Sequence, residues 1–151
     1  MGFLQHRSAL LSTSSETTIG SVDVFFGCRH ADHDWLYQSD MKDLKAKGII
    51  SQLHTAFSRD AAGQATNGNR RKYVQDIMLH DFDCLSRVED LILKHNASIF
   101  VCGDGNAMAK DVVAAITKIV KHGLNEEEES AKAYVSKMKA DERYLVDIWT
   151  S

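Results

Sequence analysis

The strongest constraint on the fold is a regular alternation of two kinds of segment. The first kind is short and apolar or alternating, with the length of a strand: residues 22–28, 49–58, 97–102 and 144–149. The second kind repeats apolar residues at helical spacing: residues 32–47, 73–95, 107–122 and 125–139. Strands that alternate with helices build an open α/β sheet. The sequence therefore predicts an open, mostly parallel sheet with helices on both faces.

Glycines and polar residues indicate where these elements end. Gly48 and Gly123 follow two of the helical segments, and glycine commonly ends a helix because it adopts a left-handed backbone conformation without strain. The helical spacing over 73–95 is interrupted near Asp81. The remaining segments are a short predicted helix over 1–10 and two predicted polar loops over 11–21 and 59–70.

Composition and charge narrow the class of protein. The chain has 151 residues, which fits one domain, and 44% of them are hydrophobic, as in a globular protein. A net charge of −3 argues against nucleic-acid binding, and no apolar run approaches the roughly 20 residues that cross a membrane. The three cysteines and seven histidines show no metal-ligand spacing. We therefore expect free thiols, no metal, and a reducing, cytoplasmic location.

Ser58 and Arg59 are the first candidates for a functional site. Ligands of open α/β sheets bind beyond the carboxyl ends of strands, and these two residues end the second predicted strand. A hydroxyl beside a planar guanidinium suits a phosphate group, and Arg70, Arg71 and Lys72 add positive charge nearby. The alternative is a surface arginine that pairs with Asp60.

The third and last predicted strands end in a second group of candidates. Cys102, Gly103, Asp104 and Gly105 follow the third strand, and the two glycines permit a sharp turn and close approach of a ligand. The alternative is an ordinary turn between a strand and a helix. Trp149 lies near the end of the last strand, where its ring packs either into the core or against a flat aromatic ligand.

Taken together, these segments resemble the NADP-binding domain of diflavin reductases, which is of the ferredoxin-reductase type. The order and spacing of the short matching segments agree over nearly the whole chain. These segments are residues 24–29, 34–37, 57–60, 73–76, 101–104, 106–112 and 143–149. Within the family, residues 2–7, 27–30 and 72–76 are most similar to the methionine synthase reductase branch. Cytochrome P450 reductases, nitric oxide synthases and sulfite reductase flavoproteins share the general pattern.

The resemblance implies a role for each candidate residue. The adenosine end of NADPH would be held by Ser58 and Arg59 at its 2′-phosphate, with further contacts from Arg71 or Lys72, Tyr73 and Gln75. The redox end would involve Cys102 beside the nicotinamide, Asp104 near it, Asp147 orienting hydride transfer and Trp149 covering the flavin ring. Cys102, Asp147 and Trp149 are thus the catalytic candidates. Hydride transfer requires the two rings to be stacked and dry, which is consistent with few polar groups there.

The resemblance also implies a larger protein around this chain. The family's phosphate-binding turn, of Thr-Gly-x-x-Pro type, would precede Gly2, and the FAD and FMN domains are absent from the sequence. We therefore expect residues 1–151 to be an N-terminally truncated NADP-binding domain that is inactive without its flavin domains. In the longer reductase, electrons would pass from NADPH through FAD and FMN to methionine synthase. The alternatives are a sibling reductase with another acceptor, such as the P450 reductase type, and a non-catalytic nucleotide-binding module.

Overall fold

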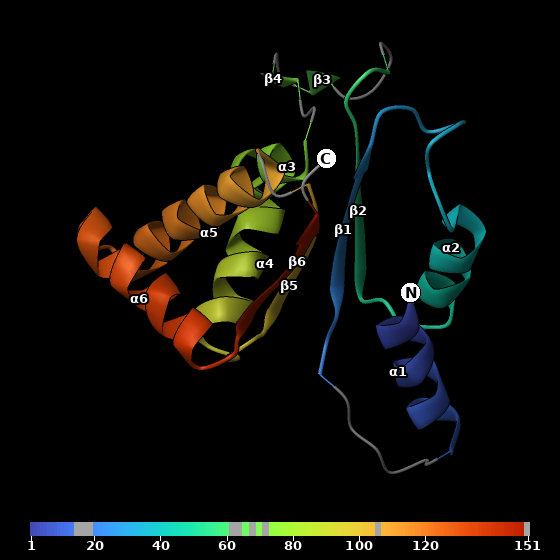
Figure 1. The fold of residues 1–151 in the computed structure, drawn as a ribbon, viewed down its shortest axis with the longest axis horizontal. Coiled ribbons are helices and arrows are strands. Elements are labelled where there is room, and N and C mark those ends of the chain that lie inside the picture. Colours follow the sequence, from blue (N-terminus) through green and yellow to red (C-terminus); the bar gives the residue numbers. More distant parts are fainter. Residues whose placement is uncertain (14–19, 61–64, 67–68, 71–72, 105–106, 150–151) are drawn as a thin grey trace. The chain divides into compact units, whose positions relative to one another are not determined.

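The computed structural model describes residues 1–13, 20–60, 65–66, 69–70, 73–104 and 107–149. Helices and strands alternate along them (Figure 1). The helices are α1 (Gly2–Thr13), α2 (Gln38–Ala46), α3 (Val74–His80), α4 (Phe82–Leu93), α5 (Met108–Leu124) and α6 (Glu128–Ala140). The strands are β1 (Asp23–Cys28), β2 (Gln52–Phe57), β3 (Ala65–Thr66), β4 (Asn69–Arg70), β5 (Ile99–Asp104) and β6 (Tyr144–Trp149).

Two parallel strand pairs carry the fold. β1 pairs with β2 and β5 pairs with β6, both in parallel, so the predicted α/β class is confirmed. A short antiparallel pair, β3 with β4, lies inside the segment that the sequence predicts as a loop. The described residues fall into two compact units, Met1–Val74 and Gln75–Ser151, and each unit contains one parallel pair.

In the first unit, α1 and α2 cover one face of the β1–β2 pair (Figure 1). The core of this layer is a cluster of buried aliphatic side chains that packs against the inward face of the strands: Leu4, Met41, Leu44, Ile49 and Ile50. Burying each such side chain contributes about 1.5–3 kcal/mol, and this contribution holds the helices on the sheet.

α2 is shorter than the sequence predicts. Helical spacing begins near Asp32, but the helix spans only Gln38–Ala46. Trp35 accounts for the difference because its ring packs against Phe26 and Phe57, with centroid distances of 6.2 and 5.4 Å. This aromatic packing explains Trp35, whereas Leu36 and Tyr37 are exposed, with 65% and 57% of their surfaces accessible.

In the second unit, α4, α5 and α6 lie on one face of the β5–β6 pair (Figure 1). Their buried side chains form the largest part of the core: Val88, Ile92, Val112, Ile116, Ile119, Val120, Val135 and Met138. The predicted interruption near Asp81 is confirmed, since its carboxylate accepts a hydrogen bond from the Cys84 N–H at 3.1 Å and begins α4 there. This is the usual action of an aspartate at the N-cap position.

The two predicted glycine stops have different outcomes. Gly48 lies just after α2 with φ 73°, so the prediction there is confirmed. Gly123 lies inside α5, which ends at Leu124 with Asn125 in the left-handed conformation at φ 52°, so that prediction is wrong. Gly123 instead lets α4 approach α5 closely, because a Cβ there would lie 2.5 Å from carbon atoms of the Glu89 and Leu93 side chains.

Candidate functional site

The carboxyl ends of β1 and β2 form the first candidate site, the β1–β2 rim (residues 28–31 and 58–60). The strand pairing continues past the strands, because the N–H of Ser58 donates to the Cys28 carbonyl and that of Arg59 donates to the Arg29 carbonyl, both at 2.9 Å. Ser58 is half-buried, whereas the side chains of Arg29 and Arg59 are exposed. The rim therefore places two exposed arginines on neighbouring segments, as a phosphate site requires.

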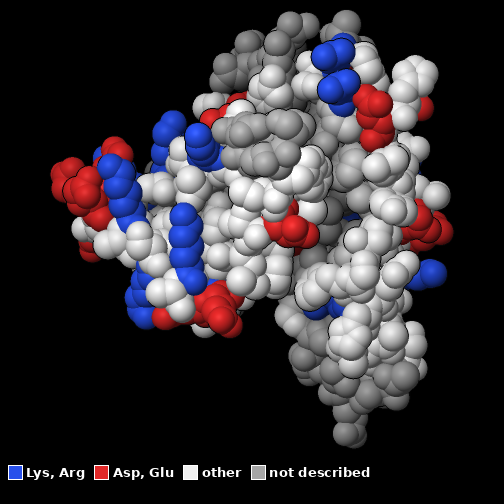
Figure 2. Space-filling model, in the orientation of Figure 1, with Lys and Arg blue, Asp and Glu red and all other residues white. Residues whose placement is uncertain are grey.

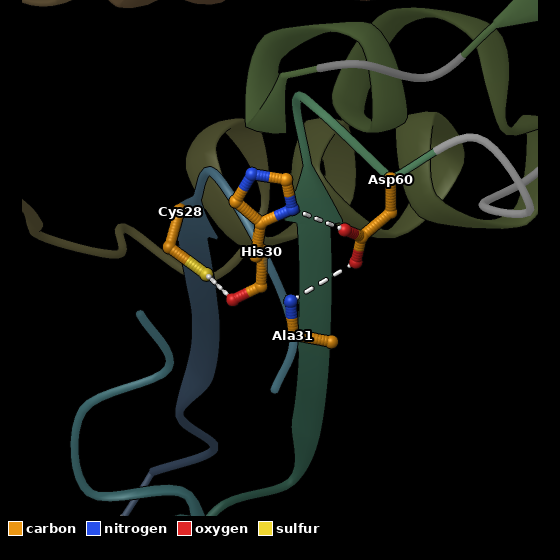
Figure 3. Close-up of polar contacts among 4 residues, drawn as sticks. All are labelled: Cys28, His30, Ala31 and Asp60. Atoms are coloured by element: carbon orange, nitrogen blue, oxygen red, sulfur yellow. Dashed lines mark hydrogen bonds and ion pairs between the residues drawn. The ribbon is translucent and has the colours of Figure 1, made fainter. Parts of the chain in front are cut away.

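Asp60 is engaged with the neighbouring loop of the same rim. Its Oδ1 lies 2.8 Å from Nδ1 of His30, and its Oδ2 accepts a hydrogen bond from the Ala31 N–H at 2.9 Å (Figure 3). These bonds, that of Ala31 first, hold the pKa of the Asp60 carboxyl below its usual value. Among the described residues Arg59 forms no ion pair, so the alternative in which it pairs with Asp60 is not observed there.

The remaining adenosine-end candidates are distributed along the chain. Tyr73 is exposed, with 51% of its surface accessible, at the end of the first unit. Gln75 begins the second unit and is half-buried. Arg71 and Lys72 lie outside the described residues.

The carboxyl ends of β5 and β6 form the second candidate site, the β5–β6 rim (residues 102–104 and 147–149). In the strand register, Cys102 is the direct partner of Asp147, and Asp104 is the partner of Trp149. Paired residues of parallel strands point to the same face, and so do residues two apart. The register therefore places Cys102, Asp147 and Trp149 together on one face of the pair.

That face is open. Cys102, Asp147 and Trp149 are all exposed, and 60% of the Trp149 surface is accessible, so its ring is not in the core. Phe100 and Leu145 share the face, with 63% and 40% of their surfaces accessible. On the opposite face Val101 and Tyr144 are buried, whereas Val146 and Ile148 each have 45% of their surface accessible. The sequence interpretation overlooks Phe100, because an aromatic residue inside a strand indicates core packing by default.

Gly103 fixes the backbone between Cys102 and the following helix. Its φ is 147°, which side-chain-bearing residues rarely adopt, and a Cβ there would lie 2.3 Å from Cε of Met108. The backbone of β5 at this position therefore requires glycine. Asp104 continues the backbone of β5, but its side chain lies outside the described part of the structure.

The predicted site residues thus form two groups, one in each unit. Ser58 and Arg59 lie on the β1–β2 rim, and Cys102, Asp147 and Trp149 lie on the β5–β6 rim. The contact between His30 and Asp60 is the feature that sequence reasoning missed. Both residues lie just after predicted strands, but 30 positions separate them and no motif indicates the contact.

In the second unit, α5 and α6 line a groove at the C-terminal end of α5. Lysines and glutamates line it together, including Lys118, Lys121, Glu126 and Glu127. Figure 2 shows acidic side chains at both ends of this helix pair, with Lys and Arg side chains between them. Such mixed charge is typical of a solvated helix surface.

The described residues contain neither a metal-binding cluster nor a helix that could span a membrane. No group of three or more His, Cys, Asp or Glu side chains in the described ranges is arranged to hold a metal ion. In the same ranges, no helix has the length and apolar character that crossing a membrane requires. Cys28, Cys84 and Cys102 form no disulfide, so the expectation of free thiols is confirmed.

Comparison with known families decides the class of domain. Residues 3–114, more than half of the chain, match the family of oxidoreductase NAD-binding domains. The chain belongs to this family. In this NAD-binding domain the matched residues include the β1–β2 rim and Cys102, so part of each candidate site lies within the match.

Individual relatives of this NAD-binding domain are reductases of greater length. Methionine synthase reductase of Homo sapiens is 38% identical over 151 residues, which are 99% of this chain and 21% of that protein. Methionine synthase reductase of Rattus norvegicus is 36% identical over 150 residues, with the same two coverages. NADPH–cytochrome P450 reductase of Rattus norvegicus is 35% identical over 150 residues, 99% of this chain and 20% of that protein. The chain spans about a fifth of these relatives, and the resemblance to diflavin reductases is confirmed.

Proposed function

We propose that this chain is the NADPH-binding part of a diflavin oxidoreductase that passes hydride from NADPH to FAD and electrons onward through FMN. The observation that carries the proposal is the β5–β6 register, which places Cys102, Asp147 and Trp149 on one exposed face at the carboxyl end of two parallel strands. That edge of an α/β sheet is where nucleotides bind. The family match to NAD-binding domains supports the same chemistry.

The β1–β2 rim supports a cofactor that bears an extra phosphate. Arg59 offers a planar, permanently charged fork that has no ion-pair partner among the described residues, and Ser58 beside it offers a hydroxyl donor. We assign these two residues to the 2′-phosphate of NADPH. Tyr73 would pack on the adenosine, with Gln75 and either Arg71 or Lys72 adding polar contacts.

The β5–β6 rim suits the redox end of the cofactor. Trp149 presents a flat, exposed ring, which fits a planar partner, while Cys102 and Asp147 supply a thiol and a carboxylate on the same face. When bound in the full-length protein, FAD supplies the acceptor for the hydride. In this chain, Asp147 and Cys102 would orient the nicotinamide, Asp104 would lie near it, and Trp149 would cover the ring system and exclude water.

For the electron acceptor, we propose methionine synthase. This finer assignment is supported by the identity to methionine synthase reductases over 99% of the chain. A P450-reductase-like acceptor is the alternative, since NADPH–cytochrome P450 reductase matches the same residues at 35% identity. Three free thiols support a reducing, cytoplasmic location.

Calorimetric titration of the 151-residue chain with 2′,5′-ADP tests the cofactor assignment. We expect binding that is stronger than that of 5′-AMP, which differs only in lacking the 2′-phosphate, and a loss of about tenfold or more in 2′,5′-ADP affinity for Arg59→Ala. Lys94→Ala, which removes a surface cation paired with Asp90 at 2.6 Å, is the control for net charge and should leave the affinity unchanged. Equal affinity of the wild-type chain for the two nucleotides would overturn the assignment.

A non-catalytic nucleotide-binding role is the competing function, because the family match over residues 3–114 concerns nucleotide binding alone. Adding the separately produced flavin domains decides between them. NADPH-driven flavin reduction by the mixture would rule out the non-catalytic role. Nucleotide binding without flavin reduction would support it.

A further inference from the structure

The contacts of Asp60 are unusual for an acidic residue adjacent to a proposed phosphate-binding arginine. A carboxylate next to Arg59 in sequence would be expected to pair with that guanidinium and weaken its attraction for a phosphate. Instead both carboxylate oxygens are directed to the loop after β1, one to the His30 imidazole and one to the Ala31 N–H (Figure 3). The carboxylate is also partly shielded, with 27% of its side chain accessible.

The loop that Asp60 holds is itself folded back on β1. The Cys28 thiol donates a hydrogen bond to the His30 carbonyl at 3.3 Å, and the Asp34 N–H donates to the same carbonyl at 3.1 Å. Arg29 lies between Cys28 and His30, and its carbonyl accepts the hydrogen bond from Arg59. Contacts on both sides of Arg29 therefore depend on the position of this loop.

We propose that Asp60 is a positioning residue of the phosphate site, which fixes the loop after β1 to the end of β2 and leaves the Arg59 guanidinium available to the ligand. The inference rests on the proposed function, because it requires a 2′-phosphate at Ser58 and Arg59. It assigns Asp60 no contact with the cofactor. Its action passes through His30 and Ala31, which hold the β1–β2 rim in one geometry.

The sign of the effect separates this role from a simple charge effect. If Asp60 acted only as a nearby negative charge, its removal would strengthen the binding of a dianionic phosphate. If Asp60 positions the rim, its removal releases the loop after β1 and weakens phosphate binding. The ligand would then have to order this loop on binding, which costs binding free energy. The two accounts predict opposite changes in the same measurement.

The measurement is the ratio of the dissociation constants of the 151-residue chain for 5′-AMP and for 2′,5′-ADP, which differ only in the 2′-phosphate. We expect Asp60→Ala to lower this ratio roughly three- to tenfold, because a hydrogen-bonded charged group is lost from the rim. Asp60→Asn keeps an oxygen that can accept from the Ala31 N–H, so it should retain most of the wild-type ratio. A merely structural defect would weaken both nucleotides equally and leave the ratio unchanged.

Asp32→Ala is the matched control. Asp32 is an exposed carboxylate on the same loop, and no hydrogen bond or ion pair joins it to a described residue. Its removal changes net charge as Asp60→Ala does, but should leave the ratio unaltered. His30→Ala removes only one of the two contacts and gives an intermediate loss, so it serves if Asp60→Ala does not fold.

The outcomes distinguish this inference from the proposed function. If wild-type chain prefers 2′,5′-ADP and loses that preference in Arg59→Ala, the proposed site stands. With that established, an unchanged or increased ratio in Asp60→Ala and His30→Ala overturns the positioning role alone. If wild-type chain shows no preference, both the site and the positioning role are wrong.

Discussion

At the β1–β2 rim the exposed residues are cationic and the backbone is held by several hydrogen bonds, whereas the β5–β6 rim exposes a thiol, a carboxylate and an aromatic ring on one open face. Both rims follow a parallel strand pair, so the same backbone geometry supports two different surfaces. The difference matches the two ends of NADPH, a charged phosphate and a flat redox ring. The chemistry of each rim is therefore set by the few residues after each strand.

The largest expected effect is on stability and concerns two glycines, Gly27 near the end of β1 and Gly103 near the end of β5. Gly103→Ala should destabilise the chain by about 2 kcal/mol, since φ 147° is nearly restricted to glycine and a Cβ would meet Met108 at 2.3 Å. Gly27→Ala, at the other strand end, places a Cβ 3.3 Å from the Val74 side chain and should cost well under half as much. Urea denaturation of both variants measures the contrast. Equal losses of stability in the two variants would show that the backbone at Gly103 does not require glycine.

Cysteine reactivity should also separate the rims. Cys102 is exposed, while burial, with Asp34 and Asp60 nearby, raises the pKa of the Cys28 thiol. Alkylation by iodoacetamide at pH 7, followed by mass spectrometry, should therefore modify Cys102 roughly tenfold faster than Cys28. NADPH should protect Cys102, and 2′,5′-ADP, which lacks nicotinamide, should not. Protection of Cys102 by both ligands to the same extent would contradict the assignment of the β5–β6 rim.

A smaller effect is expected in the fluorescence of the two tryptophans, Trp35 and Trp149. Trp35 packs against Phe26 and Phe57, whereas 60% of the Trp149 surface is accessible. NADPH should quench the fluorescence of Trp35→Phe, which retains Trp149, more strongly than that of Trp149→Phe. If the two variants are quenched equally, the proposed contact of Trp149 with the redox ring system is wrong.

The smallest expected effect is a pH dependence confined to the β1–β2 rim. The pKa of Asp60 is lowered in the folded chain, so its contribution to stability is present above the unfolded pKa, near 3.9, and is lost as pH falls through the folded value. The difference in urea midpoint between wild type and Asp60→Asn should thus shrink as the pH falls below about 4. A difference that grew as the pH fell below about 4 would have the wrong sign for the Asp60 carboxyl.

Much of the fold follows from periodicity, because the apolar runs and helical spacings reflect burial directly. β1, β5 and β6 lie within one or two residues of their predicted positions, and the interruption at Asp81 is an ordinary N-cap. The failures have tertiary causes. Gly123 permits close helix packing and does not end a helix, and Trp35 stabilises a turn where helical spacing continues.

The candidate site shows the same limit. Sequence position identifies which residues follow strands, and the register of β5 with β6 then brings Cys102 and Asp147 side by side. Contacts such as that of His30 with Asp60 join residues far apart in the chain, and single-sequence patterns contain no signal for them. Whether a strand-end aspartate pairs with Arg59 or with the opposite loop is decided by three-dimensional geometry alone.

The most direct test of the account follows the backbone amide signals of the 151-residue chain by NMR during titration. The account predicts that 2′,5′-ADP shifts signals from residues 58–60, and that NADPH shifts these together with signals from 102–103 and 147–149. Shifts at the second group with 2′,5′-ADP, or none there with NADPH, would contradict the claim that the two rims bind the two ends of NADPH.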